Sequence, residues 1–100
     1  MPRPADYAEY LRSPHWRKTR LRVLARARGK CEACHRRRAR EVHHLTYIHI
    51  GEERLDELLA LCPNCHDMAH SDRVEDRACF ASLVNKTHRL LYGAPAAREK

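Results

Sequence analysis

Two CxxC motifs constrain this 100-residue chain more than any other feature of its sequence. Cys31 and Cys34 form the first motif, Cys62 and Cys65 form the second, and 27 residues separate them. Four thiolates in this pattern fit a closed tetrahedral zinc site. A chain this short buries only about two-thirds of its surface, so its core needs such a support. The long interval suits a β-hairpin whose two ends the structural zinc would hold together.

Two other uses of paired cysteines remain open at this point. A CxxC motif can carry out redox chemistry. Both motifs also continue into a histidine, His35 and His66, which gives the CxxCH pattern of haem attachment in c-type cytochromes. A haem protein would show a strong Soret band, whereas a zinc protein is colourless. The first 13 residues contain no apolar run of signal-peptide length, which favours metal binding in the cytoplasm over haem or disulfides.

The positive charge of the chain is concentrated in one stretch. Residues 12–40 contain twelve Lys or Arg and one acid, a net charge of +11 in a chain whose total is +7. Arginine can bind a phosphate group through two parallel hydrogen bonds. Solvated helix charges would explain scattered arginines, but four of them lie together after the first CxxC motif. We therefore predict DNA-backbone contacts from Arg36, Arg37, Arg38 and Arg40.

Helices are expected on both sides of the two motifs. A short helix is expected over 6–11. The Ser13-Pro14 pair is typical of a helix start, which predicts a basic helix over 14–28 with Trp16, Leu21 and Leu24 facing inward and Gly29 after its end. A last helix is expected over about 73–91, with Ser71 or Asp72 as its cap and Gly93 after it. Its expected buried face consists of Val74, Ala78, Ala81 and Val84, and Cys79 is expected to be an inert buried thiol.

The hairpin is predicted from two segments between the motifs. Residues 41–47 (EVHHLTY) are rich in strand-forming residues and alternate in polarity. A loop around Gly51 follows, and a second strand is expected over 59–61. A further helix is expected to start at His66, directly after the second motif.

Four histidines indicate a second metal site. His43 and His44 are adjacent on the expected strand, so their side chains point to opposite faces. His66 and His70 are four residues apart, which places them on one face of a helix, ready to chelate a metal. If the strand packs against this helix, His43 or His44 completes a three-histidine site with open coordination positions, as metal-dependent hydrolysis requires. The remaining histidine is then free to accept a proton from water.

The run CEAC…EVHHLTY…LDELLALCPNCHDMAH resembles HNH endonucleases of the ββα-metal class that carry four zinc-binding cysteines. The resemblance implies an α+β fold with a β-hairpin between two zinc knuckles and flanking helices, in a single domain over 1–100 with its core at about 31–70. It also implies that His43, His66 and His70 bind the catalytic divalent metal (Mg²⁺, Mn²⁺, Ni²⁺ or Zn²⁺) and that His44 is the general base. The family's middle asparagine, thought to fix the loop that aims the base, is replaced here by Glu57.

The expected function is cleavage of DNA phosphodiester bonds, with 5′-phosphate and 3′-hydroxyl ends. DNA is favoured over RNA, with weak sequence preference, because nothing in the chain resembles a base-reading code. Tyr47 and His49 could contact substrate, although core packing suits Tyr47 better. The alternative is a non-catalytic, zinc-stapled nucleic-acid-binding module with a degenerate HNH core, which Glu57 mildly favours. No membrane partner is expected, an inhibitory protein partner is compatible with the sequence, and the sequence does not predict an oligomeric state.

Overall fold

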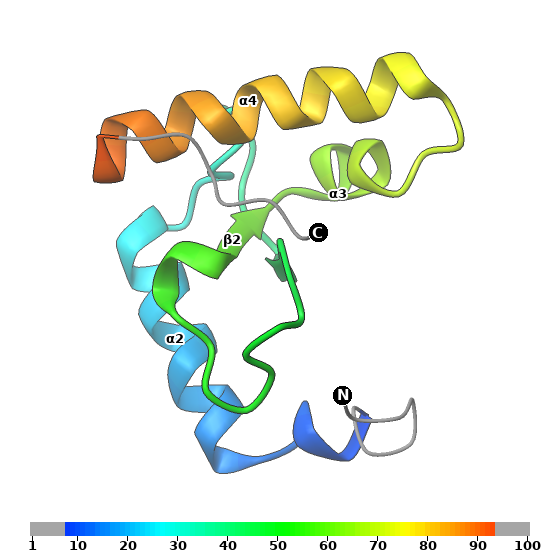
Figure 1. Ribbon diagram of the computed structural model, residues 1–100. Helices are drawn as coiled ribbons and strands as arrows, with labels where there is room; N and C mark the ends of the chain where they lie inside the picture. Colours follow the sequence, from blue (N-terminus) through cyan, green and yellow to red (C-terminus); the bar gives the residue numbers. More distant parts are fainter. Residues whose placement is uncertain (1–7, 94–100) are drawn as a thin grey trace.

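A computed structural model describes residues 8–93 and shows an α+β fold built around a two-stranded antiparallel sheet (Figure 1). Helix α2 (Pro14–Ala27) precedes strand β1 (Glu41–His44), and a 3₁₀ turn, η1 (Leu55–Glu57), leads into strand β2 (Leu58–Leu61). Helices α3 (Pro63–Ala69) and α4 (Val74–Tyr92) follow. The predicted fold class, a hairpin between two CxxC motifs with helices on both sides, is confirmed. Within the described residues, no helix has the length and apolarity needed to cross a membrane.

Strand β2 is buried on both faces, which explains its uninterrupted apolar sequence, LLAL. Leu58 and Ala60 pack against α2, whereas Leu59 and Leu61 belong to the cluster that contains the four knuckle cysteines. In β1, Val42 pairs with Ala60 and His43 with Leu59. Because strand residues alternate between faces, Val42 and His44 lie on the α2 side, and Glu41 and His43 lie on the α3 side.

Helix α2 begins where the sequence predicts. The Ser13 hydroxyl accepts a hydrogen bond of 3.1 Å from the backbone N–H of Trp16, and Pro14 occupies the first turn. Arg28 then ends the helix in the left-handed conformation, and Gly29 follows with a φ of +80°.

The buried stripe of α2 differs from the predicted one at Leu21. Trp16, Thr19 and Val23 form the buried stripe, and Leu24 is half-buried. Leu21 is 63% exposed because it lies two residues after Thr19, about 200° further around the helix.

Two predicted boundaries of the hairpin and α3 are wrong. Strand β1 ends at His44, not at Tyr47, because the Thr46 hydroxyl accepts a hydrogen bond from the N–H of Ile48 and turns the chain. Helix α3 begins at Pro63 instead of His66, since the Cys62 sulfur caps it by accepting a hydrogen bond from the N–H of Cys65. In the short expected helix, residues 8–10 are helical, and positions 6 and 7 lie outside the described residues.

The start of α4 also differs from the prediction. Its N-cap is Arg73, not Ser71 or Asp72. The Ser71 hydroxyl instead accepts a hydrogen bond from the N–H of Arg73 and donates one to Asp76. Gly93 ends the helix in the left-handed conformation, as its position predicts.

The buried face of α4 agrees with the prediction only at Val84. Phe80, Val84, Thr87 and His88 are buried, whereas Val74, Ala78 and Ala81 are exposed. The thiol of Cys79 is exposed as well, so the prediction of an inert buried thiol is wrong. The face follows Phe80, the large side chain that packs over the knuckle cysteines, and small alanines at similar spacing do not outweigh it.

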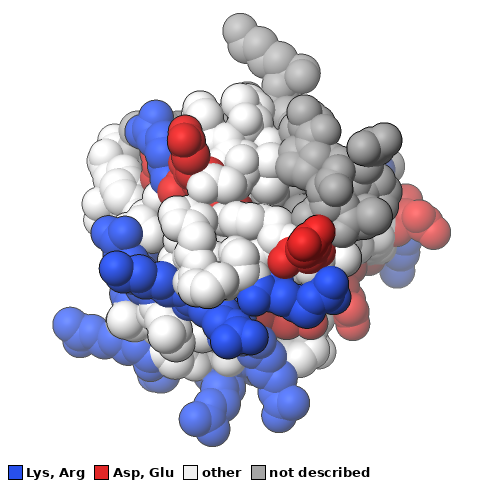
Figure 2. Space-filling view, turned by 90° about the horizontal axis from the view of Figure 1, so that it is seen from below, with Lys and Arg blue, Asp and Glu red and all other residues white. Residues whose placement is uncertain are grey.

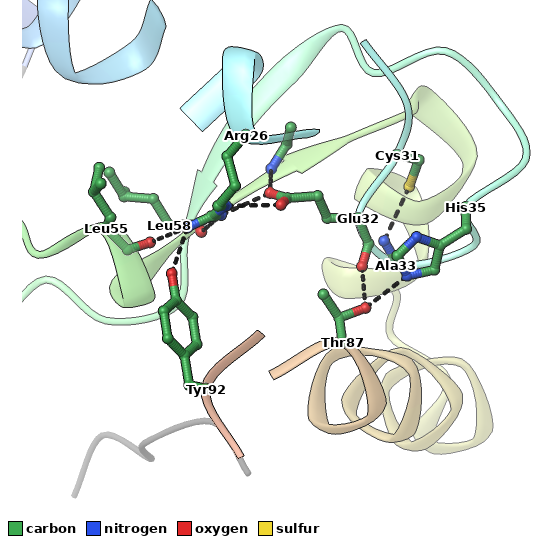
Figure 3. A network of polar contacts seen from close by, with 10 residues as sticks. Arg26, Cys31, Glu32, Ala33, His35, Leu55, Leu58, Thr87 and Tyr92 are labelled. Carbon is green, nitrogen blue, oxygen red and sulfur yellow. Dashed lines mark hydrogen bonds and ion pairs between the residues drawn. The ribbon is translucent and has the colours of Figure 1, made fainter. Parts of the chain in front are cut away.

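The Arg26 guanidinium joins α2 to the first knuckle and to the hairpin (Figure 3). Its Nε and one terminal nitrogen donate hydrogen bonds of 2.8 and 2.7 Å to the two carboxylate oxygens of Glu32. The guanidinium also donates to the carbonyl oxygens of Leu55 and Leu58 and to the hydroxyl of Tyr92. The Glu32 carboxylate, whose side chain is 5% exposed, accepts a further hydrogen bond from the N–H of Ala60.

Replacing Arg26 with alanine should lower the free energy of unfolding by about 3–5 kcal/mol, because the carboxylate of Glu32 would stay buried without its charge partner. Chemical denaturation monitored by circular dichroism measures this change. Arg22→Ala, an exposed position on the same helix, is the matched control and should change stability by less than about 0.5 kcal/mol. Equal losses in the two variants would contradict a structural role for the Arg26 network.

Candidate metal centres and nucleic-acid interface

The four predicted cysteine ligands form one cluster. The sulfurs of Cys31, Cys34, Cys62 and Cys65 all lie within 4.8 Å of one another. A tetrahedral zinc with bonds of 2.3 Å places its sulfurs about 3.8 Å apart. The sulfurs of Cys34 and Cys62 are 3.9 Å apart, so the cluster fits zinc and could hold a structural ion. One shared cluster differs from two separate haem attachment motifs, which disfavours the cytochrome alternative.

The thiols of the cluster differ in acidity. Burial raises the pKa of Cys34, but hydrogen bonds from the backbone N–H groups of Arg37 and Arg36 outweigh it and lower the pKa to about 6. Burial raises the pKa of Cys31 and that of Cys65. Zinc binds thiolates, so the lowered pKa of Cys34 favours the form that can bind the ion.

Three of the four predicted histidines also come together. His43 lies on β1, His66 on α3, and His70 at the end of α3, and each offers a ring nitrogen within 4.8 Å of the others. The ring centroids of His66 and His70 are 4.7 Å apart, and those of His43 and His70 are 5.1 Å apart. This cluster is less buried than the cysteine cluster: His43 and His66 are half-buried, and His70 is exposed. Three nitrogen donors at an accessible position fit a metal site with open coordination positions.

The pKa of His43 favours metal binding. Burial, followed by the nearby charges of His70, His66 and His44, lowers this pKa to about 4. The ring is therefore neutral at pH 7, and neutral imidazole is the form that donates a lone pair to a metal.

Glu41 joins this site, although the sequence analysis did not identify it. Its Oε2 lies 2.9 Å from Nδ1 of His66. A carboxylate that accepts the Nδ1 proton leaves Nε2 as the nitrogen with the lone pair. The two-residue period of a β-strand could have identified Glu41, because this residue lies two positions before His43 and hence on the same face of β1.

His44 lies on the opposite face of β1 from the three-histidine cluster. Its ring stacks against Trp16 and against Tyr47, with centroid distances of 4.9 and 5.1 Å and interplanar angles of 18°. The residue is 4% exposed, and its Nε2 lies 2.8 Å from Oε2 of Glu53. Tyr47 is half-buried and packs against this ring, which agrees with the preference for a packing role.

Residues 45–57 form a loop, and Glu57 at the C-terminal end of this loop makes contacts that hold it in place. The carbonyl of Glu57 accepts a hydrogen bond of 2.8 Å from the N–H of Leu45. Its carboxylate accepts one of 3.1 Å from the N–H of Arg54 and lies 2.5 Å from Nδ1 of His49. The residue that replaces the family's asparagine thus makes contacts at both ends and in the middle of the loop.

The predicted phosphate-binding arginines are exposed. Arg36, Arg37, Arg38 and Arg40 lie between the first knuckle and β1. The backbone of this turn is fixed, since the N–H of Cys31 donates to the carbonyl of Arg37 and the N–H of Arg40 donates to that of Leu61. A view from below shows Lys and Arg side chains gathered along one side of the molecule (Figure 2).

Comparison with known protein families agrees with this geometry. Residues 31–72 match the family model described as HNH endonuclease. The matched segment contains both knuckles, the hairpin, α3 and the three-histidine cluster, so the resemblance seen in the sequence is confirmed for these residues. No curated protein and no solved structure matches the chain. The HNH match indicates a nuclease or nucleic-acid-binding function.

Cys34→Ser should lose the zinc that the wild type retains, about one ion per chain, because three thiolates leave the tetrahedron incomplete. Elemental analysis after dialysis measures the metal content, and thermal unfolding measures the loss of stability. Cys79→Ser provides the control, because this exposed thiol lies outside the cluster. Zinc retained by Cys34→Ser, or lost from Cys79→Ser, would show that the ligand set is different.

Proposed function

We propose that the chain is a metal-dependent DNA endonuclease and that residues 1–100 form one nuclease domain with its core at about 31–70. The observation that carries the proposal is the three-histidine cluster, which lies inside the HNH match and beside a separate four-cysteine cluster. A protein that only needed a zinc support would need only the cysteines. The accessible histidines provide a second position with the donor set of a hydrolytic metal.

In this mechanism each group of side chains has one role. His43, His66 and His70 hold the divalent metal, which stabilises negative charge on the phosphoryl and leaving oxygens when it is bound. Glu41 fixes the ring of His66 through its Nδ1. His44 accepts a proton from the attacking water, which displaces the 3′ oxygen and leaves a 5′-phosphate. Arg36, Arg37, Arg38 and Arg40 contact the flanking phosphates.

One observation favours the alternative of a non-catalytic nucleic-acid-binding module. His44 is 4% exposed, and its Nε2 is already hydrogen-bonded to Glu53. A general base needs one ring nitrogen within reach of water. Cleavage assays separate the two functions because the binding module would retain DNA affinity without cleavage.

His44→Ala should reduce nicking of supercoiled plasmid by about 10²–10⁴-fold in the presence of Mg²⁺, Mn²⁺ or Ni²⁺, because the attacking water would lose its proton acceptor. Gel separation of nicked from supercoiled plasmid measures the rate, and elemental analysis checks that the variant keeps its zinc. His15→Ala, at an exposed histidine on α2, should cut like the wild type. If the wild type binds DNA but cuts with none of the three metals, the binding-module alternative is correct.

The double variant Arg36→Ala/Arg37→Ala should bind duplex DNA more weakly and with a shallower salt dependence. Each lost phosphate contact reduces the slope of log K against log salt by about 0.9. Fluorescence anisotropy at several salt concentrations measures both quantities. Arg89→Ala, at an exposed position near the end of α4, is the charge control and should leave the slope nearly unchanged. A slope that falls equally in both proteins would argue against a phosphate-binding role specific to this turn.

A further inference from the structure

The loop over residues 45–57 places a buried carboxylate against His44. The side chain of Glu53 is 1% exposed, and its two oxygens have different partners. Oε2 lies 2.8 Å from Nε2 of His44, and Oε1 accepts a hydrogen bond of 2.5 Å from the hydroxyl of Tyr10. Glu53 therefore joins the segment before α2 to the end of β1 through one side chain.

The protonation of this pair follows from its hydrogen bonds. Burial would raise the pKa of Glu53, but the hydrogen bonds from His44 and Tyr10 outweigh it and hold the pKa below its ordinary value. The carboxylate is thus ionised at neutral pH and can only accept hydrogen bonds. A neutral His44 must then carry its proton on Nε2, so its lone pair lies on Nδ1.

Aromatic stacking limits the other movements of the ring. Trp16 and Tyr47 both stack against the His44 imidazole, each at an interplanar angle of 18°. Stacking fixes the plane of the ring but does not distinguish its two nitrogens, because a ring flipped about the Cβ–Cγ bond occupies nearly the same plane. Only a hydrogen-bond partner at the ring edge selects one orientation, and Glu53 is such a partner.

We propose that Glu53, through its contact with Nε2, is a positioning residue that fixes the tautomer and the orientation of His44, the proton acceptor of the proposed mechanism. This inference rests on the proposed endonuclease function. In the family that the sequence resembles, an asparagine is thought to fix the loop that aims the base. Here Glu57 fastens the loop through Leu45, Arg54 and His49, and Glu53, carried on that loop, contacts the base directly.

Nitrogen-15 NMR of the zinc-loaded protein, without a second metal, tests the tautomer. Long-range couplings between the ring nitrogens and carbon-bound protons of His44 identify the protonated nitrogen. In the wild type the proton should lie on Nε2. In Glu53→Ala this preference should be lost, whereas Glu53→Gln should retain much of it because the amide oxygen can still accept. A wild-type proton on Nδ1 would overturn the proposal.

Plasmid cleavage tests the consequence for the reaction. Glu53→Ala should lower kcat by about 10–100-fold with little change in KM, the effect typical of removing a residue that orients another. The kcat of Glu53→Gln should lie between that of Glu53→Ala and that of the wild type. Glu52→Gln is the matched control: it is an exposed glutamate one residue away and should match the wild type in kcat and in the His44 tautomer.

The outcomes separate a positioning role from a structural one. If Glu53 only stabilised the loop, its variants would lower the melting temperature and raise KM without changing the tautomer of His44. If Glu53→Ala loses zinc or unfolds, the isosteric Glu53→Gln carries the comparison, and a loss of the His44 tautomer preference without any fall in kcat in that folded variant overturns the proposal. If the wild type does not cut DNA, the proposed endonuclease function fails. The tautomer of His44 in the wild type still shows whether Glu53 fixes the orientation of this ring.

Discussion

The buried carboxylate of Glu32 holds together the elements that surround the hairpin. Glu32 lies inside the first CxxC motif, and its side chain binds Arg26 of α2 and the N–H of Ala60 in β2. Its backbone carbonyl accepts a hydrogen bond from the hydroxyl of Thr87 in α4. Its own N–H donates to the carbonyl of Ala60. One residue thus fixes the first knuckle against β2, the strand that leads directly into the second knuckle.

The position of the hairpin between two helical layers sets the chemistry of the site. Since β1 has α2 on one side and α3 on the other, two adjacent histidines enter different environments. His43 meets the two histidines of the α3 segment, where ring nitrogens converge. His44 meets Trp16, Tyr47 and Glu53, where aromatic rings and a carboxylate fix it. The proposed metal ligand and the proposed proton acceptor can therefore be neighbours in sequence without competing for the same ion.

Much of the fold and of the metal ligands could be predicted because their signals are local. CxxC spacing identifies the four thiols, the alternation of strand residues separates His43 from His44, and the spacing of four residues brings His66 and His70 together. The buried face of α4 could not be predicted correctly because alanines at helical spacing carry little information about burial. Phe80 decides which face of the helix turns inward. Cys79 was misplaced for the same reason.

The carboxylate partners could not be predicted because they depend on contacts between distant segments. Glu41 binds His66 across 25 positions, and Glu53 lies in a loop whose path no periodicity specifies. A glutamate in such a loop resembles any solvated charge until the structure shows that its side chain is 1% exposed. The sequence therefore indicates the candidate metal ligands better than the carboxylates that contact the candidate histidines.

The neighbours of Glu57 explain how a carboxylate can occupy the position where the resemblance to HNH endonucleases predicts an asparagine. An asparagine amide can fasten a loop without introducing charge, whereas a carboxylate at 8% exposure loses solvation and needs donors in return. The N–H of Arg54 supplies one, and Nδ1 of His49, at 2.5 Å, supplies the other. Because the side chain of His49 remains 46% exposed, its own desolvation penalty is smaller than that of the buried carboxylate. Glu57 and His49 therefore act as a pair that fixes the loop from which Glu53 reaches His44.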